Sequence, residues 1–133
     1  MYARLLAQAR YRLRMSTIAN VLVGLVALLH AGFLVLEMFL WKTPTGRRVF
    51  GLPPDVMAAS APLAANQGLY NGFLAAGLVW GLLLGPAGFA VKVFFLVCVV
   101  VAGVFGAATA KKTILYVQAL PGALALAAVW LAR

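Results

Sequence analysis

The sequence contains few acidic residues and few charges of any kind. Only two of its 133 residues are Asp or Glu, and charged residues make up 10% of the chain, where a soluble domain carries about 25%. Hydrophobic residues make up 65%, and the mean hydropathy is +1.04. A small soluble domain cannot hide that much apolar surface, because it leaves much of its surface exposed. The composition therefore predicts that lipid is the solvent for most of the chain.

Ligands for metals and sulfur chemistry are also scarce. The chain has a single cysteine, Cys98, and a single histidine, His30. An internal disulfide is excluded, and one His, one Glu and a distant Cys do not make a metal-binding set. No cofactor motif is present, so we expect neither a metal nor another cofactor.

The net charge of +9 does not predict a nucleic-acid partner. Ten of the eleven basic residues lie at the ends of apolar stretches, which is how charges that anchor membrane helices are distributed, and no stripe of aromatic residues accompanies them. They are Arg4, Arg10, Arg12 and Arg14; Lys42, Arg47 and Arg48; Lys111 and Lys112; and Arg133. We therefore expect membrane lipids as partners. The charges divide evenly between the two sides of the predicted topology, which leaves the orientation open.

Four apolar segments are long enough to cross a membrane, for which about 20 residues suffice. They are residues 18–41, 62–84, 87–110 and 113–132. Helices satisfy every backbone group within one segment, as lipid requires, and short connections place successive helices antiparallel. The sequence thus predicts an all-α, integral membrane, up-down four-helix bundle over residues 15–133. One longer loop joins helices 1 and 2, and residues 1–14 form a basic extension before the bundle.

Glycines recur at four-residue intervals in the second segment, at Gly68 and Gly72 and then at Gly77, Gly81 and Gly85. Small residues at this spacing let membrane helices approach closely. We interpret them mainly as packing positions within the bundle, with a homodimer as the alternative.

Polar residues from all four segments fall near one predicted membrane face. Glu37 lies about 6 Å inside the end of its segment, and His30 lies about 16 Å inside, near the midplane. The others at this end are Asn66, Gln67, Tyr70, Asn71, Tyr116 and Gln118. The opposite half holds only Asn20 and Lys92, and we expect the lysine to reach the interface along its flexible stem. The pattern predicts a polar half-cavity above an apolar floor.

Polar groups at membrane depth are costly and usually mark a site or a structural pair. A buried Glu37 and a buried His30 can exchange protons near neutral pH, so we predict both as catalytic residues. The amides and tyrosines would bind a hydrophobic small-molecule ligand and orient its oxygen atoms. The competing interpretation is that these groups cap or join helices through hydrogen bonds.

Three stretches of the chain resemble a family of small bacterial membrane proteins known as domain of unknown function 1304. They are LLHAGFLVLEMFLW at residues 28–41, TPTGRRVFGL at 43–52 and LAANQGLYNGFLAAGLVWG at 63–81, and GAATAKKTILYVQALPGALAL fits as well. The resemblance covers nearly the whole chain except residues 1–14. It implies four spans and a multi-pass location in the bacterial inner membrane, and it implies no particular activity.

Three functions are open on the sequence alone. The first is a cofactor-independent intramembrane enzyme, an isomerase or cyclase that uses acid–base chemistry on a lipophilic small molecule. The second is a proton-coupled small-molecule exporter similar to small multidrug resistance transporters, which also have four helices and one essential carboxylate in helix 1. The third is a membrane scaffold or accessory subunit.

Overall fold

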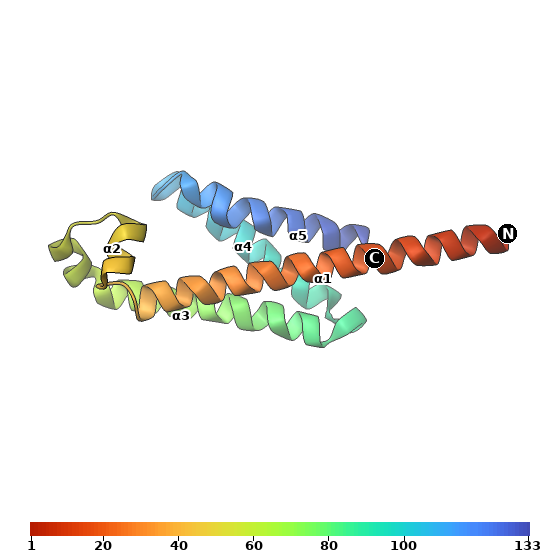
Figure 1. Cartoon of the computed structure of the whole chain (residues 1–133), viewed down its shortest axis with the longest axis horizontal. Helices are drawn as coiled ribbons and strands as arrows, with labels where there is room; N and C mark the ends of the chain where they lie inside the picture. The colour runs from red at the N-terminus through yellow and green to blue at the C-terminus, as the bar shows by residue number, and fades with distance from the viewer. The chain divides into compact units, whose positions relative to one another are not determined.

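The protein is built from helices joined by short connections. A computed structural model describes residues 1–133 and contains no strand, which confirms the all-α prediction (Figure 1). In chain order the elements are α1 (Tyr2–Met38), α2 (Pro44–Phe50), α3 (Pro54–Leu83), the 3₁₀ turn η1 (Gly85–Gly88), α4 (Phe89–Thr109), the π-helical turn η2 (Leu115–Ala119) and α5 (Leu120–Leu131).

The chain divides into two compact units. The terminal unit comprises Met1–Val26 and Gly77–Arg133, and the central unit comprises Ala27–Ala76. The part of α1 up to Val26 and the end of α3 from Gly77 belong to the terminal unit, and the remainder of both helices belongs to the central unit. The single bundle expected over residues 15–133 stays a prediction.

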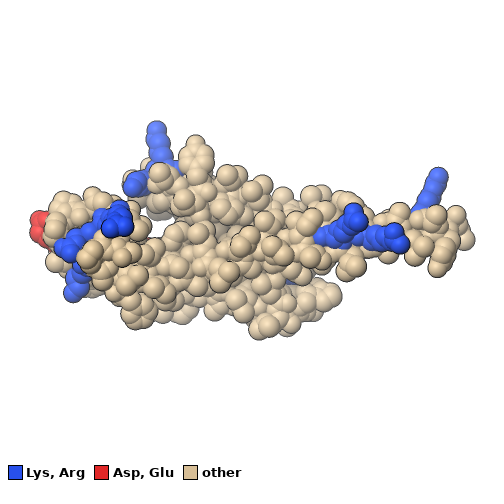
Figure 2. Space-filling model, in the orientation of Figure 1, with Lys and Arg blue, Asp and Glu red and all other residues tan.

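Two helical stretches are long and apolar enough to cross a membrane, Tyr2–Met38 and Gly85–Thr109. The stretch Leu115–Leu131 is apolar but shorter. Figure 2 shows blue Lys and Arg side chains gathered over α2 and over the N-terminal stretch of α1, while the visible surface of the apolar helices is largely tan.

Several helix boundaries differ from those expected. The basic extension is helical from Tyr2 and continuous with α1, because no proline interrupts the stretch and Ala, Leu and Arg favour helix. The helix ends at Met38, and Thr43, whose position before Pro44 disfavours helical dihedrals, is extended with ψ of 166°. α3 begins at Pro54, inside the expected loop, and continues through Pro62, where the second span was expected to begin.

The loop expected between the first two spans contains α2. Thr43 is its N-cap, and the Thr43 hydroxyl accepts a hydrogen bond from the Gly46 amide at 3.3 Å, while Pro44 fits the first turn, where no amide donor is needed. Gly51 ends the helix with φ of +68°, a conformation in which a side chain is strained. The Trp41 indole Nε1 donates to the Met57 carbonyl at 2.9 Å, which fixes this segment to the start of α3.

Small residues let the helices of each unit approach, as expected. In the terminal unit, a β-carbon on Gly103 would lie 2.7 Å from the Ala119 amide nitrogen, and one on Gly122 would lie 2.7 Å from Val99. Gly77 lies directly against the Phe95 ring. The glycine spacing is therefore used for packing within the chain, and the homodimer stays a prediction.

Candidate functional site

The predicted polar residues that the structure brings together are Glu37 and Asn71. The Asn71 side-chain Nδ2 donates to Oε2 of Glu37 at 2.7 Å, across the α1–α3 contact of the central unit. Gly68 lies one turn before Asn71, and a β-carbon there would be 3.1 Å from that of Glu37 and 2.7 Å from Met38 Cγ. Glycine at this position thus allows the helices to come close enough for the hydrogen bond.

Asn71 is held rigidly, whereas Glu37 keeps one oxygen open. Asn71 is 6% exposed, and its Nδ2 also donates to the Gln67 carbonyl at 3.3 Å. Glu37 is half-buried. Its Oε1 accepts no hydrogen bond from the protein and is not fully buried, so a ligand can reach this oxygen. The pair therefore offers a fixed carboxylate with one oxygen oriented by an amide and the other able to accept a proton or a donor group.

The other predicted residues of the central unit occupy different surroundings. His30 is fully buried, and its ring meets Phe33 edge-on at 5.6 Å between centroids. The side chains of Asn66, Gln67 and Tyr70 are exposed, and their role as ligand-binding residues stays a prediction.

Tyr116 and Gln118 lie on η2 in the terminal unit. The Gln118 Nε2 donates to the Val99 carbonyl at 3.3 Å, and Tyr116 is 67% exposed. The wide π turn precedes Pro121, which has no amide hydrogen for the Val117 carbonyl and whose ring crowds that group. Gln118 thus joins two helices, which is the structural role that the sequence left open.

Lys92 is directed toward the connection between α3 and α4. Its side chain is 8% exposed, and its Nζ donates to Asn20 Oδ1 at 3.2 Å and to the Gly85 carbonyl of η1 at 3.5 Å. That the lysine reaches the membrane interface stays a prediction. The half expected to be an apolar floor therefore contains a buried cation. A usable signal was present, because Asn20 and Lys92 fall near the start of spans that begin on the same predicted side.

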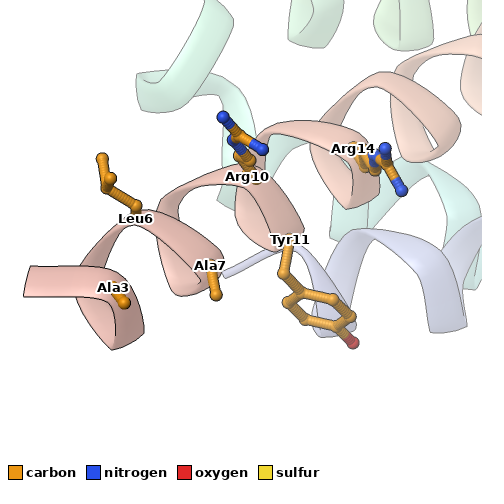
Figure 3. A pocket seen from close by; sticks show the side chains of 6 residues that line it. All are labelled: Ala3, Leu6, Ala7, Arg10, Tyr11 and Arg14. Atoms are coloured by element: carbon orange, nitrogen blue, oxygen red, sulfur yellow. The ribbon is translucent and has the colours of Figure 1, made fainter.

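The first helix also has a shallow hollow near its N-terminus. Figure 3 shows it beside side chains of α1 only, with Arg10, Tyr11 and Arg14 among them. Its lining comes from one exposed helix, so it has neither the enclosure nor the converging polar groups of a ligand site.

Taken together, the chain is a small all-α protein with two helices apolar enough to cross a membrane and a carboxylate–amide pair between two helices. The profile of a family described as "Protein of unknown function (DUF1304)" matches residues 24–130, and the chain belongs to this family. It is also similar to the "Uncharacterized protein YpaA" of Lactococcus lactis, with 29% identity over 106 residues that cover 78% of this chain and 89% of the relative. No solved structure matches significantly.

Proposed function

We propose that the protein is a multi-pass inner-membrane protein of four spanning helices, and that Glu37 carries out acid–base chemistry on a lipophilic small molecule. The observation that supports this is the 2.7 Å hydrogen bond from Asn71 to Oε2, which leaves Oε1 accessible. A general base needs an oriented carboxylate within reach of the proton that it removes. An isomerase or cyclase of this kind would need no cofactor.

In this proposal the two residues have different roles. Glu37 takes a proton from a weakly acidic carbon of the ligand through Oε1 and returns it at another position. Asn71 is a positioning residue, because its amide fixes the carboxylate and is itself held by the Gln67 carbonyl. The catalytic role predicted for the buried His30 stays a prediction, and the proposal does not depend on it.

Solvent deuterium provides a direct test. The purified protein is incubated in D₂O with total lipid extract from bacteria that produce it, and deuterium in each lipid is measured by mass spectrometry. Proton abstraction predicts that one lipid class gains deuterium with the native protein. Glu37→Gln should abolish the exchange, and Asn71→Ala should slow it by about 10-fold to 100-fold, as loss of an orienting group commonly does.

Gln8→Ala is the matched control, because it removes an exposed amide from α1, the helix that carries Glu37, outside the predicted site. It should leave the exchange unchanged. Exchange that persists in Glu37→Gln, or that is absent with the native protein, would show that Glu37 is not a general base.

A proton-coupled exporter is the second candidate, favoured by the fact that Glu37 is the only acidic residue of α1. In that case the open oxygen would bind either a proton or a lipophilic cation. Adding tetraphenylphosphonium to the protein in weakly buffered detergent should then release protons, and Glu37→Gln should not release them. Proton release without any deuterium exchange would favour the exporter over the enzyme.

A further inference from the structure

The terminal unit contains a cavity of about 670 Å³. None of the residues predicted to form the Glu37 site lines this cavity. Its wall is formed by residues 9–20 of α1, by η1 with the start of α4, and by the end of α5. Three cations line it, one from each region: Arg12, Lys92 and Arg133. The volume lies within the range of about 300–1,000 Å³ that is typical of small-molecule sites.

These cations have no acidic partner. Glu37 and Asp55 are the two acids of the chain, and both belong to the central unit, so the terminal unit has no Asp or Glu side chain. Lys92 donates to two neutral oxygens, those of Asn20 and Gly85. One of its three N–H donors therefore has no acceptor within the protein, and no counter-charge neutralises the ammonium group. A buried charge without a counter-charge is costly, and a bound anion would offset that cost.

Arg133 is positioned at the same cavity by aromatic rings. Its guanidinium carbon lies 4.8 Å from the Phe89 ring centroid and 5.9 Å from that of Trp130. Both rings lie within cation–π distance of the guanidinium, and its N–H groups donate no hydrogen bond within the protein, so they are available to a ligand. The planar edge of the guanidinium suits the oxygens of a phosphate group, to which arginine commonly donates two parallel hydrogen bonds.

The remaining wall is apolar and lies at the ends of apolar helices. Leu13, Pro86 and Val129 are among its lining residues, and the cavity adjoins the first turn of α4 and the last turn of α5. In a membrane protein these helix ends lie at headgroup depth, where basic pockets between helices bind anionic lipids. A ligand that combines a phosphate with a short apolar part matches both halves of the cavity.

We propose that this cavity binds the phosphate headgroup of an anionic phospholipid. Lys92 and Arg12 contact the phosphate, Arg133 closes over it from the Phe89 ring, and the apolar wall receives the glycerol and first methylene groups. The proposal shares with the Glu37 chemistry only the location in a membrane.

The test measures lipid binding to the full-length protein in detergent by native mass spectrometry. The probes are phosphatidylglycerol, phosphatidylcholine with the same acyl chains, and soluble glycerol phosphate. We expect the native protein to retain phosphatidylglycerol in preference to the other two. Arg12→Gln with Arg133→Gln should weaken that binding about thirtyfold, since each cation near a headgroup contributes about fivefold.

Lys111→Gln with Lys112→Gln is the matched control, because it also removes two exposed charges from the terminal unit but lies outside the cavity. Its binding should be unchanged. Lys92→Gln should also lose binding, and if that buried substitution prevents folding, the double variant at the exposed Arg12 and Arg133 still decides the question.

Three results would overturn the proposal: equal weakening in the two double variants, equal retention of phosphatidylcholine, or binding of glycerol phosphate as tight as that of the lipid. The last result would assign the cavity to a soluble phosphate ester. Glu37→Gln should keep full lipid binding while it loses deuterium exchange, so the two proposals fail independently.

Discussion

Gly103 lies at a close helix approach that a single methyl group can test. A β-carbon on Gly103 would lie 2.7 Å from the backbone nitrogen of Ala119 and 2.9 Å from its Cα. Backbone atoms cannot rotate away as a side-chain tip can, so Gly103→Ala must push α4 away from η2. Overpacking of this kind costs about 1–3 kcal/mol.

Gly24→Ala is the matched comparison, because it should raise the stability of the protein where Gly103→Ala lowers it. Gly24 lies within α1, and a β-carbon there would meet nothing within 4 Å. Alanine favours helix over glycine by about 1 kcal/mol, so this variant should gain stability. Both glycines lie within helices, so the gain in helix propensity applies to both variants, and the two should differ by the overpacking cost of about 1–3 kcal/mol.

The assay is unfolding of the purified protein in detergent, followed by thermal melting or by titration with a denaturing detergent. At this chain length 1 kcal/mol corresponds to roughly 3–5 °C in melting temperature. Gly103→Ala should therefore melt well below Gly24→Ala. Equal melting temperatures for the two variants would refute the close approach of α4 and η2.

Two further predictions concern the segment around α2. Gly51→Ala should destabilise the protein by about 1–2 kcal/mol because its φ of +68° strains a β-carbon; Gly51→Asn should lose less, and equal melting of both variants would count against the left-handed cap. Trp41→Phe should lose about 1 kcal/mol, because the Met57 carbonyl loses its indole donor at 2.9 Å. An unchanged melting temperature for Trp41→Phe would mean that this bond contributes nothing.

The sequence alone determined the helical character of the chain and much of its packing. Long, nearly unbroken apolar stretches without alternation predict helices rather than half-exposed strands. The four-residue glycine spacing predicted close approach, and the structure uses it at Gly68 and Gly77. The family resemblance, carried by residues 28–41, 43–52 and 63–81, is confirmed by a match over residues 24–130.

Local signals in the connections were harder to interpret. The Thr43 cap, Pro44 and Gly51 all favour a short helix. The helix α2 that they bound has only seven residues and contains proline and glycine itself, so its composition also fits a loop. The helix expected to end at residue 41 ends at Met38, and the one expected to begin at residue 62 begins at Pro54 and continues through Pro62.

Which polar groups meet was decided by the tertiary structure. Helical periodicity placed Glu37, Asn66, Gln67 and Asn71 at one depth, but depth along an axis does not fix rotation about it. The α1–α3 contact at Gly68 selects Asn71 as the partner of Glu37 and leaves Asn66 and Gln67 exposed.

The same reason explains the basic cavity. Arg12, Lys92 and Arg133 are far apart in the sequence, and each alone resembles an ordinary anchoring charge. Only folding of the terminal unit brings them to one cavity, because long-range side-chain contacts depend on helix rotation and tilt, which sequence periodicity does not specify.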